Sequence, residues 1–193
     1  MDKYWVWFSR INKIGAKVQN ELIQKYKTPE EIFRLTKDKL QENNNLESEK
    51  IEIILDKSYR ENLDKYLEYM EKNGIKMITI EDEKYPQNLR NIYDPPVVLY
   101  IKGNEDILKN HSIAIIGSRN CSSYGKQIAK QFAYNLSKNN INIISGLAKG
   151  IDSSAHLGAI EANKSTIAVV GCGLDRVYPE ENIVIFNKII NKG

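Results

Sequence analysis

The run SIAIIGSR, residues 112–119, decides the fold of this chain: a β-branched apolar stretch ends at a glycine and a polar turn. The same order returns in INIISGLAKGID (residues 141–152) and in TIAVVGCGLD (residues 166–175), and helical periodicity follows each turn. Ser122 or Ser123 can cap the helix after the first turn, and its inner face is predicted to hold Ile128, Ala129, Phe132, Ala133 and Leu136. The apolar face of the last helix is predicted to carry Ile183, Phe186 and Ile190. Short apolar strands that alternate with amphipathic helices are typical of βαβ units. We therefore predict an α/β fold with a parallel sheet, whose three glycine turns meet at the carboxyl edge of the sheet.

The composition is that of an ordinary globular protein. Of the 193 residues, 41% are hydrophobic and 27% are charged, and no apolar run approaches the length of a membrane span. The N-terminus lacks the basic region and apolar core of a secretory signal. The only cysteines, Cys121 and Cys172, lie in glycine turns and are expected to be reduced; with His111 and His156 at scattered spacing, they do not form a zinc site. We expect a cytoplasmic protein with no membrane partner, metal or cofactor.

Charge is distributed unevenly along the chain. Residues 1–95 hold 17 Lys/Arg and 18 Asp/Glu, a net charge of −1, whereas residues 96–193 hold 11 and 7, a net charge of +4. The positive excess therefore lies in the half with the glycine turns. It mildly favours a phosphate-bearing partner and is far from a nucleic-acid-binding tail.

The first 40 residues are predicted to form short helices. Thr28 followed by Pro29 is a helix start, with the threonine as N-cap. The apolar-glycine turn at Ile14 and Gly15 resembles a helix-hairpin-helix element, which can bind a DNA phosphate. A plain αα-hairpin used for packing is favoured, since the local acids leave no basic patch.

Residues 46–73 are predicted to form one long helix or two abutting ones, ending at Asn73 and Gly74. The tyrosines in this segment could stack on bases, but at helical spacing they favour the core. Strands are expected at 75–80 and 97–101, and the domain boundary near residue 74. This separates a small helical domain (residues 1–74; helix-hairpin-helix or SAM-like) from an α/β domain (residues 75–193).

A glycine turn that opens a helix presents unpaired N–H groups and the positive end of the helix dipole, which together form an anion site. Gly117 would let the backbone approach a phosphate, Ser118 adds a hydroxyl and Arg119 adds a planar, always-charged fork. Lys149 stands in the second turn. Three such turns at one sheet edge favour ligand binding over pure packing.

Two other chemistries fit less well. The third glycine of a dinucleotide fingerprint is missing after Gly173, and there is no Walker A sequence. Asp152 and His156, at i and i+4 on one helix, could be an acid–base pair of an enzyme that cleaves nucleoside monophosphates. A structural role is favoured, with Asp152 as an N-cap and His156 facing the turn. The alternative of a Rossmann-like nucleotide-binding protein or such an enzyme stays open.

The motifs themselves resemble those of the DNA-processing protein A family (DprA, also called Smf). IIGSR (115–119) with SSYG (122–125) resembles its first motif, and SGLAKGID (145–152) with His156 and Gly158 its second. TIAVVGCGLD (166–175) with Tyr178, Pro179 and Asn182 resembles its third, and the run from Tyr85 to Gly103 matches the lead into that family's Rossmann-like domain. The likeness covers roughly residues 75–190.

The resemblance implies a single-stranded DNA-binding protein of natural transformation, which protects incoming strands and loads the RecA recombinase. The family is not known as an enzyme, so no catalytic residue is assigned. The implied DNA- and phosphate-binding residues are Gly117, Ser118, Arg119, Ser145, Gly146, Lys149, Gly150, Gly171 and Gly173. Residues given a structural or motif role are Asp152, His156, Asp175, Tyr178, Pro179 and Asn182.

Family members continue beyond the point that corresponds to Gly193, with further strands and the surfaces for dimerisation and RecA contact. The resemblance therefore implies that this chain is the N-terminal portion of such a protein, cut within the Rossmann-like domain as a fragment, a truncated gene product or half of a split gene. The full-length family can form a homodimer.

Overall fold

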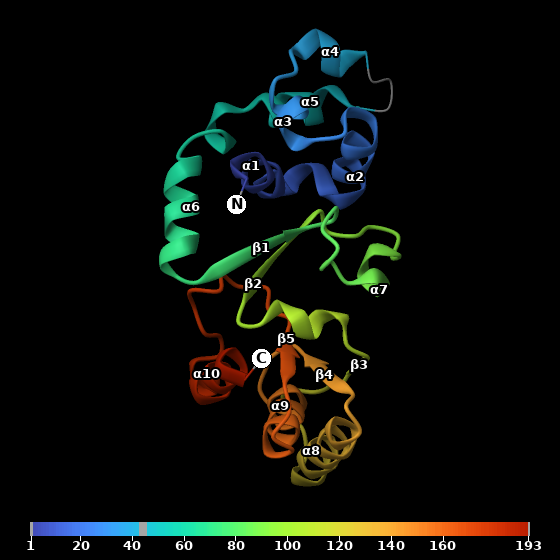
Figure 1. Cartoon of the computed structure of the whole chain (residues 1–193), viewed down its shortest axis with the longest axis vertical. Coiled ribbons are helices and arrows are strands. Elements are labelled where there is room, and N and C mark those ends of the chain that lie inside the picture. Colours follow the sequence, from blue (N-terminus) through green and yellow to red (C-terminus); the bar gives the residue numbers. More distant parts are fainter. Residues whose placement is uncertain (1, 43–45, 193) are drawn as a thin grey trace. The chain divides into compact units, whose positions relative to one another are not determined.

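The structure is a computed structural model that describes residues 2–42 and 46–192 (Figure 1). The chain divides into unit 1, Met1–Tyr100, and unit 2, Ile101–Gly193. In the described parts of the chain, no helix has the length and apolar character needed to cross a membrane.

Unit 1 is mainly helical. Its elements in chain order are α1 (Lys3–Arg10), η1 (Asn12–Ile14), α2 (Gly15–Tyr26), α3 (Pro29–Phe33), α4 (Lys37–Gln41), α5 (Ser48–Leu55), η2 (Lys57–Tyr59), α6 (Leu63–Lys72), β1 (Ile75–Thr79) and α7 (Gln87–Arg90). Strand β2 (Val98–Lys102) pairs with β1 in a two-stranded sheet. Residues 46–73 therefore form two helices and not one long helix. The two helices do not abut, because residues 56–62, which include η2, separate α5 from α6.

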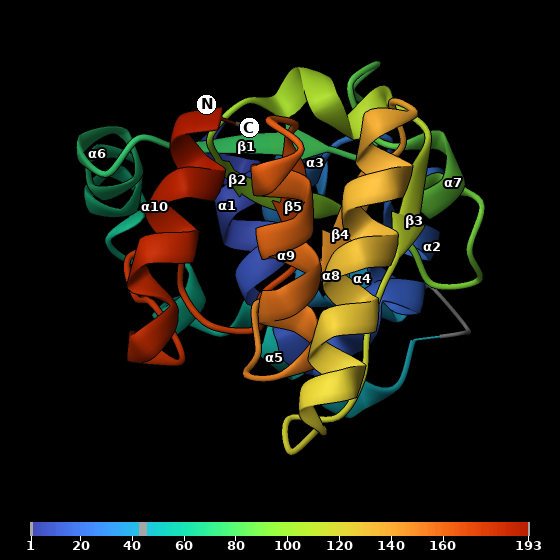
Figure 2. The ribbon, with the colours of Figure 1, turned by 90° about the horizontal axis from the view of Figure 1, so that it is seen from below.

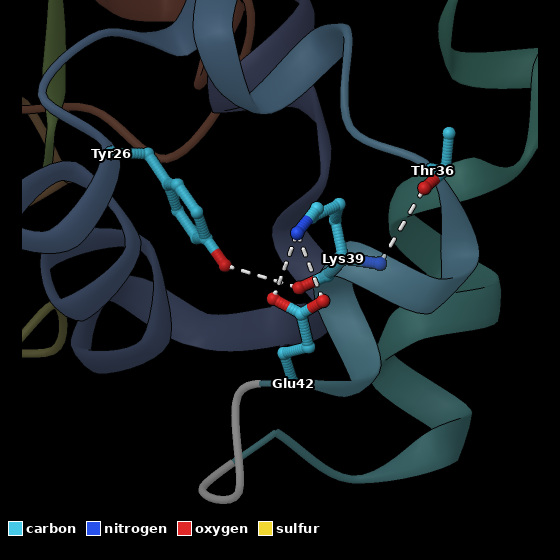
Figure 3. A network of polar contacts seen from close by, with 4 residues as sticks. All are labelled: Tyr26, Thr36, Lys39 and Glu42. Carbon is cyan, nitrogen blue, oxygen red and sulfur yellow. Dashed lines mark hydrogen bonds and ion pairs between the residues drawn. The ribbon is translucent and has the colours of Figure 1, made fainter.

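Threonine side chains cap the short helices α3 and α4, and the cap of α3 is the predicted one. The Thr28 hydroxyl accepts a hydrogen bond from the Glu31 amide at 3.2 Å and caps α3. Thr36 accepts from the amide of Lys39 in α4, and the Tyr26 hydroxyl donates to the carbonyl of Lys39 at 3.3 Å (Figure 3). Thus α4, which has only five residues, is held at its start by a cap and from outside by the end of α2.

The core of unit 1 is apolar and includes residues beyond the predicted helical domain. Its fully buried side chains come from the helices and the connection between α1 and η1, and include Trp7, Phe8, Ile11, Leu22, Ile32, Leu40, Ile51 and Ile54. Val97 and Val98 lie in the same cluster, so the segment that ends in β2 packs with the helices. The division into two compact units consequently falls after Tyr100, later in the chain than the domain boundary predicted near residue 74. That domain boundary stays a prediction.

The tyrosines of α6 are not core residues, contrary to the prediction. Tyr66 and Tyr69 are 42% and 43% exposed. The guanidinium of Arg10 lies 3.9 Å from the centroid of the Tyr66 ring and donates to the Tyr59 carbonyl. The half-exposed Tyr66 ring thus stacks with the Arg10 guanidinium instead of packing in the apolar core.

Unit 2 has the predicted α/β architecture. Its elements are η3 (Glu105–Lys109), β3 (Ser112–Ala114), α8 (Ser123–Lys138), β4 (Asn142–Ser145), α9 (Ile151–Glu161), β5 (Thr166–Ala168), η4 (Glu180–Asn182) and α10 (Ile183–Lys192). The strands form a parallel sheet in the order β3-β4-β5, with Ser112 opposite Asn142 and Ile143 opposite Thr166. Helices α8 and α9 lie side by side along the sheet, and α10 packs against α9 and β5 (Figure 2).

Helix α8 buries its small residues instead of its large ones. Ala129, Ala133 and Ser137 face inward, while Phe132, predicted to lie on the inner face, is 60% exposed. The reason is the close approach of α9: a Cβ on Gly158 would lie 2.9 Å from the Cβ of Ala133. In α10 the buried residues are Ile185 and Ile189, and Ile183 is 46% exposed instead of inward.

Candidate nucleic-acid interface

Three connecting segments follow the three parallel strands of unit 2. Turn 1 (residues 115–122) follows β3, turn 2 (146–150) joins β4 to α9, and turn 3 (169–179) follows β5. Because adjacent parallel strands point the same way, all three turns leave the sheet at its carboxyl edge. This is the arrangement that the sequence predicted.

Turns 1 and 2 contact each other through their backbones. The Ile151 amide donates to the Ser118 carbonyl at 3.3 Å. Gly150 has a φ of +85°, and a Cβ there would lie 2.7 Å from the carbonyl oxygen of Arg119. A Cβ on Gly117 would likewise lie 2.7 Å from the side chain of Ile151. Glycine at these positions lets turn 2 support turn 1 from behind, which fixes the path of the chain through Arg119.

Turn 1 offers unused hydrogen-bond donors. Residues 116–120 are all exposed. The amides of Gly117, Ser118 and Arg119 donate to no described residue, and the Arg119 guanidinium forms no ion pair or hydrogen bond within residues 2–42 and 46–192. The Ser118 hydroxyl accepts from the Asn120 amide at 3.2 Å and keeps its own proton to donate. These groups converge on one short segment and match the needs of a phosphate oxygen.

At turn 2, the Ser145 hydroxyl and the Gly146 amide are used for contacts within the protein. The Ser145 side chain is buried and donates to the Ile115 carbonyl at 2.6 Å, so its hydroxyl holds β4 to the chain after β3. The Gly146 amide donates to a carboxylate oxygen of Asp152 at 3.1 Å. The predicted N-cap role of Asp152 is wrong, since the N-cap of α9 is Gly150; Asp152 lies inside the first turn and reaches back to Gly146 instead.

The charge of Lys149 is neutralised within the protein. Its ammonium lies 2.5 Å from a carboxylate oxygen of Glu181, and both side chains are about half exposed. Beside this pair, the buried Asn182 side chain donates to the carbonyls of Leu147 and Ala148 at 2.8 and 3.3 Å. No local pattern in the sequence points to Glu181, because its partner Lys149 lies 32 positions away along the chain.

Turn 3 is partly open to solvent. Gly171 is exposed, and a Cβ there would meet nothing within 4 Å. Gly173 is also exposed, and Asp175 lies 3.7 Å from the exposed guanidinium of Arg176. Tyr178 is 67% exposed, whereas Pro179 is buried and is the N-cap of η4. Cys121 and Cys172 carry free thiols.

His156 lies in the core and not at the turns. It is fully buried, and its Nδ1 lies 2.9 Å from the Thr166 hydroxyl oxygen, which itself donates to the Ile143 carbonyl. Nδ1 must therefore carry the proton, and Nε2 is left buried without a partner. Burial lowers the pKa of His156 to about 4, and Asp152 opposes this only in part. The imidazole is thus a neutral packing residue in the arrangement seen here, and no group of three or more His, Cys, Asp or Glu in the described residues could hold a metal.

Comparisons with known proteins agree on one family. The model of the DNA recombination-mediator protein A family matches residues 76–193. The DNA processing protein DprA of Streptococcus pneumoniae is 47% identical over 104 residues, which are 54% of this chain and 36% of that protein. Protein Smf of Synechocystis is 30% identical over 194 residues, which cover 98% of this chain and 49% of that protein.

Solved structures show the same likeness. The X-ray structure of DNA processing protein A from S. pneumoniae superposes with a TM-score of 0.76 at 29% identity, over 98% of this chain and 64% of that one. A structure of DNA processing protein A from Helicobacter pylori, described for its single-stranded DNA binding mode, superposes with a TM-score of 0.53 at 33% identity, over 61% and 53% of the two chains. The chain thus spans between about a third and a half of the length of the two relatives named above and under two thirds of either solved chain.

Proposed function

Because this chain belongs to the DNA recombination-mediator protein A family, we propose that it binds single-stranded DNA through unit 2, with turn 1 as the main phosphate contact. The observation that carries the proposal is the set of unused donors on turn 1: three consecutive exposed amides and the unpaired guanidinium of Arg119. The binding mode described for the H. pylori relative supports the choice of ligand.

The remaining residues of the proposed interface have graded roles. Gly171 leaves the backbone of turn 3 open to a strand that passes the same sheet edge, whereas the Asp175 carboxylate lies where a Cβ on Gly173 would be. Gly146 and Ser145 act on the architecture of the site, since their donors are used internally. Lys149 can contact a phosphate only when the phosphate displaces Glu181, so it contributes less than Arg119.

The test is fluorescence anisotropy with a labelled oligothymidylate over a series of salt concentrations. Arg119→Gln should weaken binding roughly tenfold and make the slope of log K against log salt shallower by about 0.7, the value of one phosphate contact on a single strand. Lys138→Gln, which removes one charge at the far end of α8, is the matched control and should leave the affinity within about twofold. Equal losses in the two variants would contradict the role of turn 1.

A second variant separates the graded roles. Glu181→Gln removes the carboxylate that holds Lys149 and should strengthen DNA binding several-fold, because it frees a cation and removes a negative charge from the interface. Lys149→Gln should weaken binding less than Arg119→Gln does. An unchanged affinity in Glu181→Gln would show that the strand does not pass turn 2.

The proposal extends to the cellular role that the family resemblance implies: protection of incoming strands in the cytoplasm during natural transformation and loading of RecA, with a homodimer as the acting form. The test of this role is whether the chain stimulates RecA-dependent strand pairing on DNA covered by a single-strand-binding protein, with Arg119→Gln, which should bind the strand about tenfold less tightly, as the control.

A further inference from the structure

Unit 1 contains a pocket far along the sequence from the glycine turns. It encloses about 360 Å³ and is lined by Lys3, Tyr4, Phe33, Arg60, Asn62, Leu63, Asp64 and Lys65. These residues come from the start of α1, the end of α3, the segment before α6 and the first turn of α6. Three of them are cations and one is a carboxylate, so the lining has a positive excess.

The cations of this pocket lack carboxylate partners. Within the described parts of the chain, Lys3, Arg60 and Lys65 form no ion pair with Asp or Glu. The Lys3 ammonium lies 5.7 Å from the centroid of the Tyr4 ring, and both lysines are exposed. Some other surface lysines of unit 1 do have carboxylate partners, as Lys37 has Glu52 and Lys39 has Glu42. An anion in the pocket would therefore meet charges that nothing else neutralises.

Arg60 is the most constrained of the three. Its guanidinium lies 4.4 Å from the Phe33 ring centroid and 5.5 Å from that of Trp7, and its Nε is buried without a partner. Its side chain makes one hydrogen bond, from Nη2 to the Ile54 carbonyl at 3.4 Å. Burial lowers the pKa of Arg60, which shows that its charge is partly removed from water without a compensating acid.

The backbone at the same place adds donors. Helix α6 has ten residues, and its N-cap Asn62 has a φ of +58° and makes no capping hydrogen bond with its side chain. The first amides of α6 are therefore not satisfied by a cap, and the positive end of the helix lies in the pocket lining. This reinforces the preference for an anion that the unpaired cations establish.

We propose that this pocket binds a phosphate group through Arg60, Lys3 and Lys65. A phosphate has several acceptor oxygens, so it can bond to the guanidinium and the α6 amides together, and the planar fork of arginine suits it. The ligand can be a phosphate monoester, free or on a nucleotide, or a phosphodiester of a nucleic acid. The site is separate from turn 1, and its existence does not rest on the proposed function of unit 2.

The chain supplies its own probe for the test. Both tryptophans, Trp5 and Trp7, lie in α1 of unit 1, and Trp7 is next to Arg60, so their emission reports on this pocket and not on the glycine turns. The whole chain is titrated with inorganic phosphate at constant ionic strength set with chloride. A saturable change in emission is expected; emission that follows the chloride control throughout would overturn the proposal.

Two variants on the same helix sharpen the result. Lys65→Glu lies in the first turn of α6, where an acid favours the helix, so the variant keeps its fold while the apparent affinity for phosphate falls roughly tenfold or more. Lys72→Glu, in the last turn of α6, should leave the affinity within about twofold. Equal effects in both variants would mean that only net charge matters and would also overturn the proposal.

The two sources of phosphate are distinguished by parallel titrations. Thymidine 5′-monophosphate tests the monoester, and an oligothymidylate without a terminal phosphate tests the diester. A tryptophan response to the oligonucleotide alone identifies a second contact for DNA, whereas a response to the monoester alone identifies a small-molecule site. Anisotropy of Arg119→Gln is measured separately, so loss of the DNA site in unit 2 leaves the conclusion on this pocket unchanged.

Discussion

The buried His156 should make unit 2 unstable in mild acid, and the size of the effect follows from its surroundings. The pKa of His156 is lowered from 6.5 to about 4 by burial, because a second ring proton on Nε2 would have no acceptor. Above pH 6.5 the imidazole is neutral in the folded and the unfolded chain. Between pH 6.5 and about 4 only the unfolded chain takes up the proton, so the free energy of unfolding falls by about 1.4 kcal/mol per pH unit. From about pH 7.5 to about pH 5 the loss comes to about 2 kcal/mol.

The assay compares the chain with His156→Asn, whose side-chain amide can still donate to Thr166 but does not titrate. Hydrogen exchange of peptides from α9 is measured at both pH values. It reports on unit 2, whereas tryptophan fluorescence would report on unit 1. Comparing the two chains at the same pH cancels the effect of pH on intrinsic exchange. The stability advantage of the wild type should shrink by about 2 kcal/mol on going to pH 5. The same difference at both pH values would refute the reasoning.

Four further substitutions have defined outcomes. Gly158→Ala should destabilise unit 2 by about 1–3 kcal/mol despite the better helix propensity of alanine, because the added methyl group would clash with α8. Gly171→Ala places its methyl group in open space and should change the stability by no more than about 0.5 kcal/mol. Both values are measured by urea unfolding followed by circular dichroism. Tyr85→Phe should cost about 1 kcal/mol through loss of the 2.7 Å bond to the Pro96 carbonyl, and a spectrophotometric titration should lose one phenol whose pKa burial raises to about 12. Asn182→Ala should speed hydrogen exchange of residues 146–150 and cost about 1–3 kcal/mol, since it leaves the Leu147 carbonyl without its partner.

Most of the fold of unit 2 could be predicted from local sequence patterns. The strands at residues 112–114, 142–145 and 166–168 fall within or beside the predicted apolar runs, and each prediction rested on neighbours in sequence. Ser122 caps α8 through the Gly125 amide at 3.1 Å, one of the two alternatives that the sequence allowed. Such features are readable because the groups that form them lie within one or two turns of the chain.

The predictions that were wrong or incomplete failed because segments distant in the sequence contact each other. Phe132 has the spacing of a core residue, but Gly158 brings α9 so close that α8 buries alanines in its place. Asp152 has the position of an N-cap, but the Gly146 amide competes for it. The pairing of Lys149 with Glu181 has no signature in either local sequence. The placement of the three turns at one sheet edge was therefore predicted correctly, while which of their donors are already used inside the protein required the structure.

The order of the sheet strands has a consequence for how unit 2 is made. Each strand pairs with the next one in the chain: β3 with β4, and β4 with β5. No strand has to wait for a later segment to be inserted between it and its neighbour. The sheet can therefore grow one strand at a time as the polypeptide leaves the ribosome, with each loop closed over a short length of chain. In that order of events turn 1 is supported only when residues 150 and 151 are in place, so the proposed DNA contact would be assembled when the second βα unit is complete, before β5 is added.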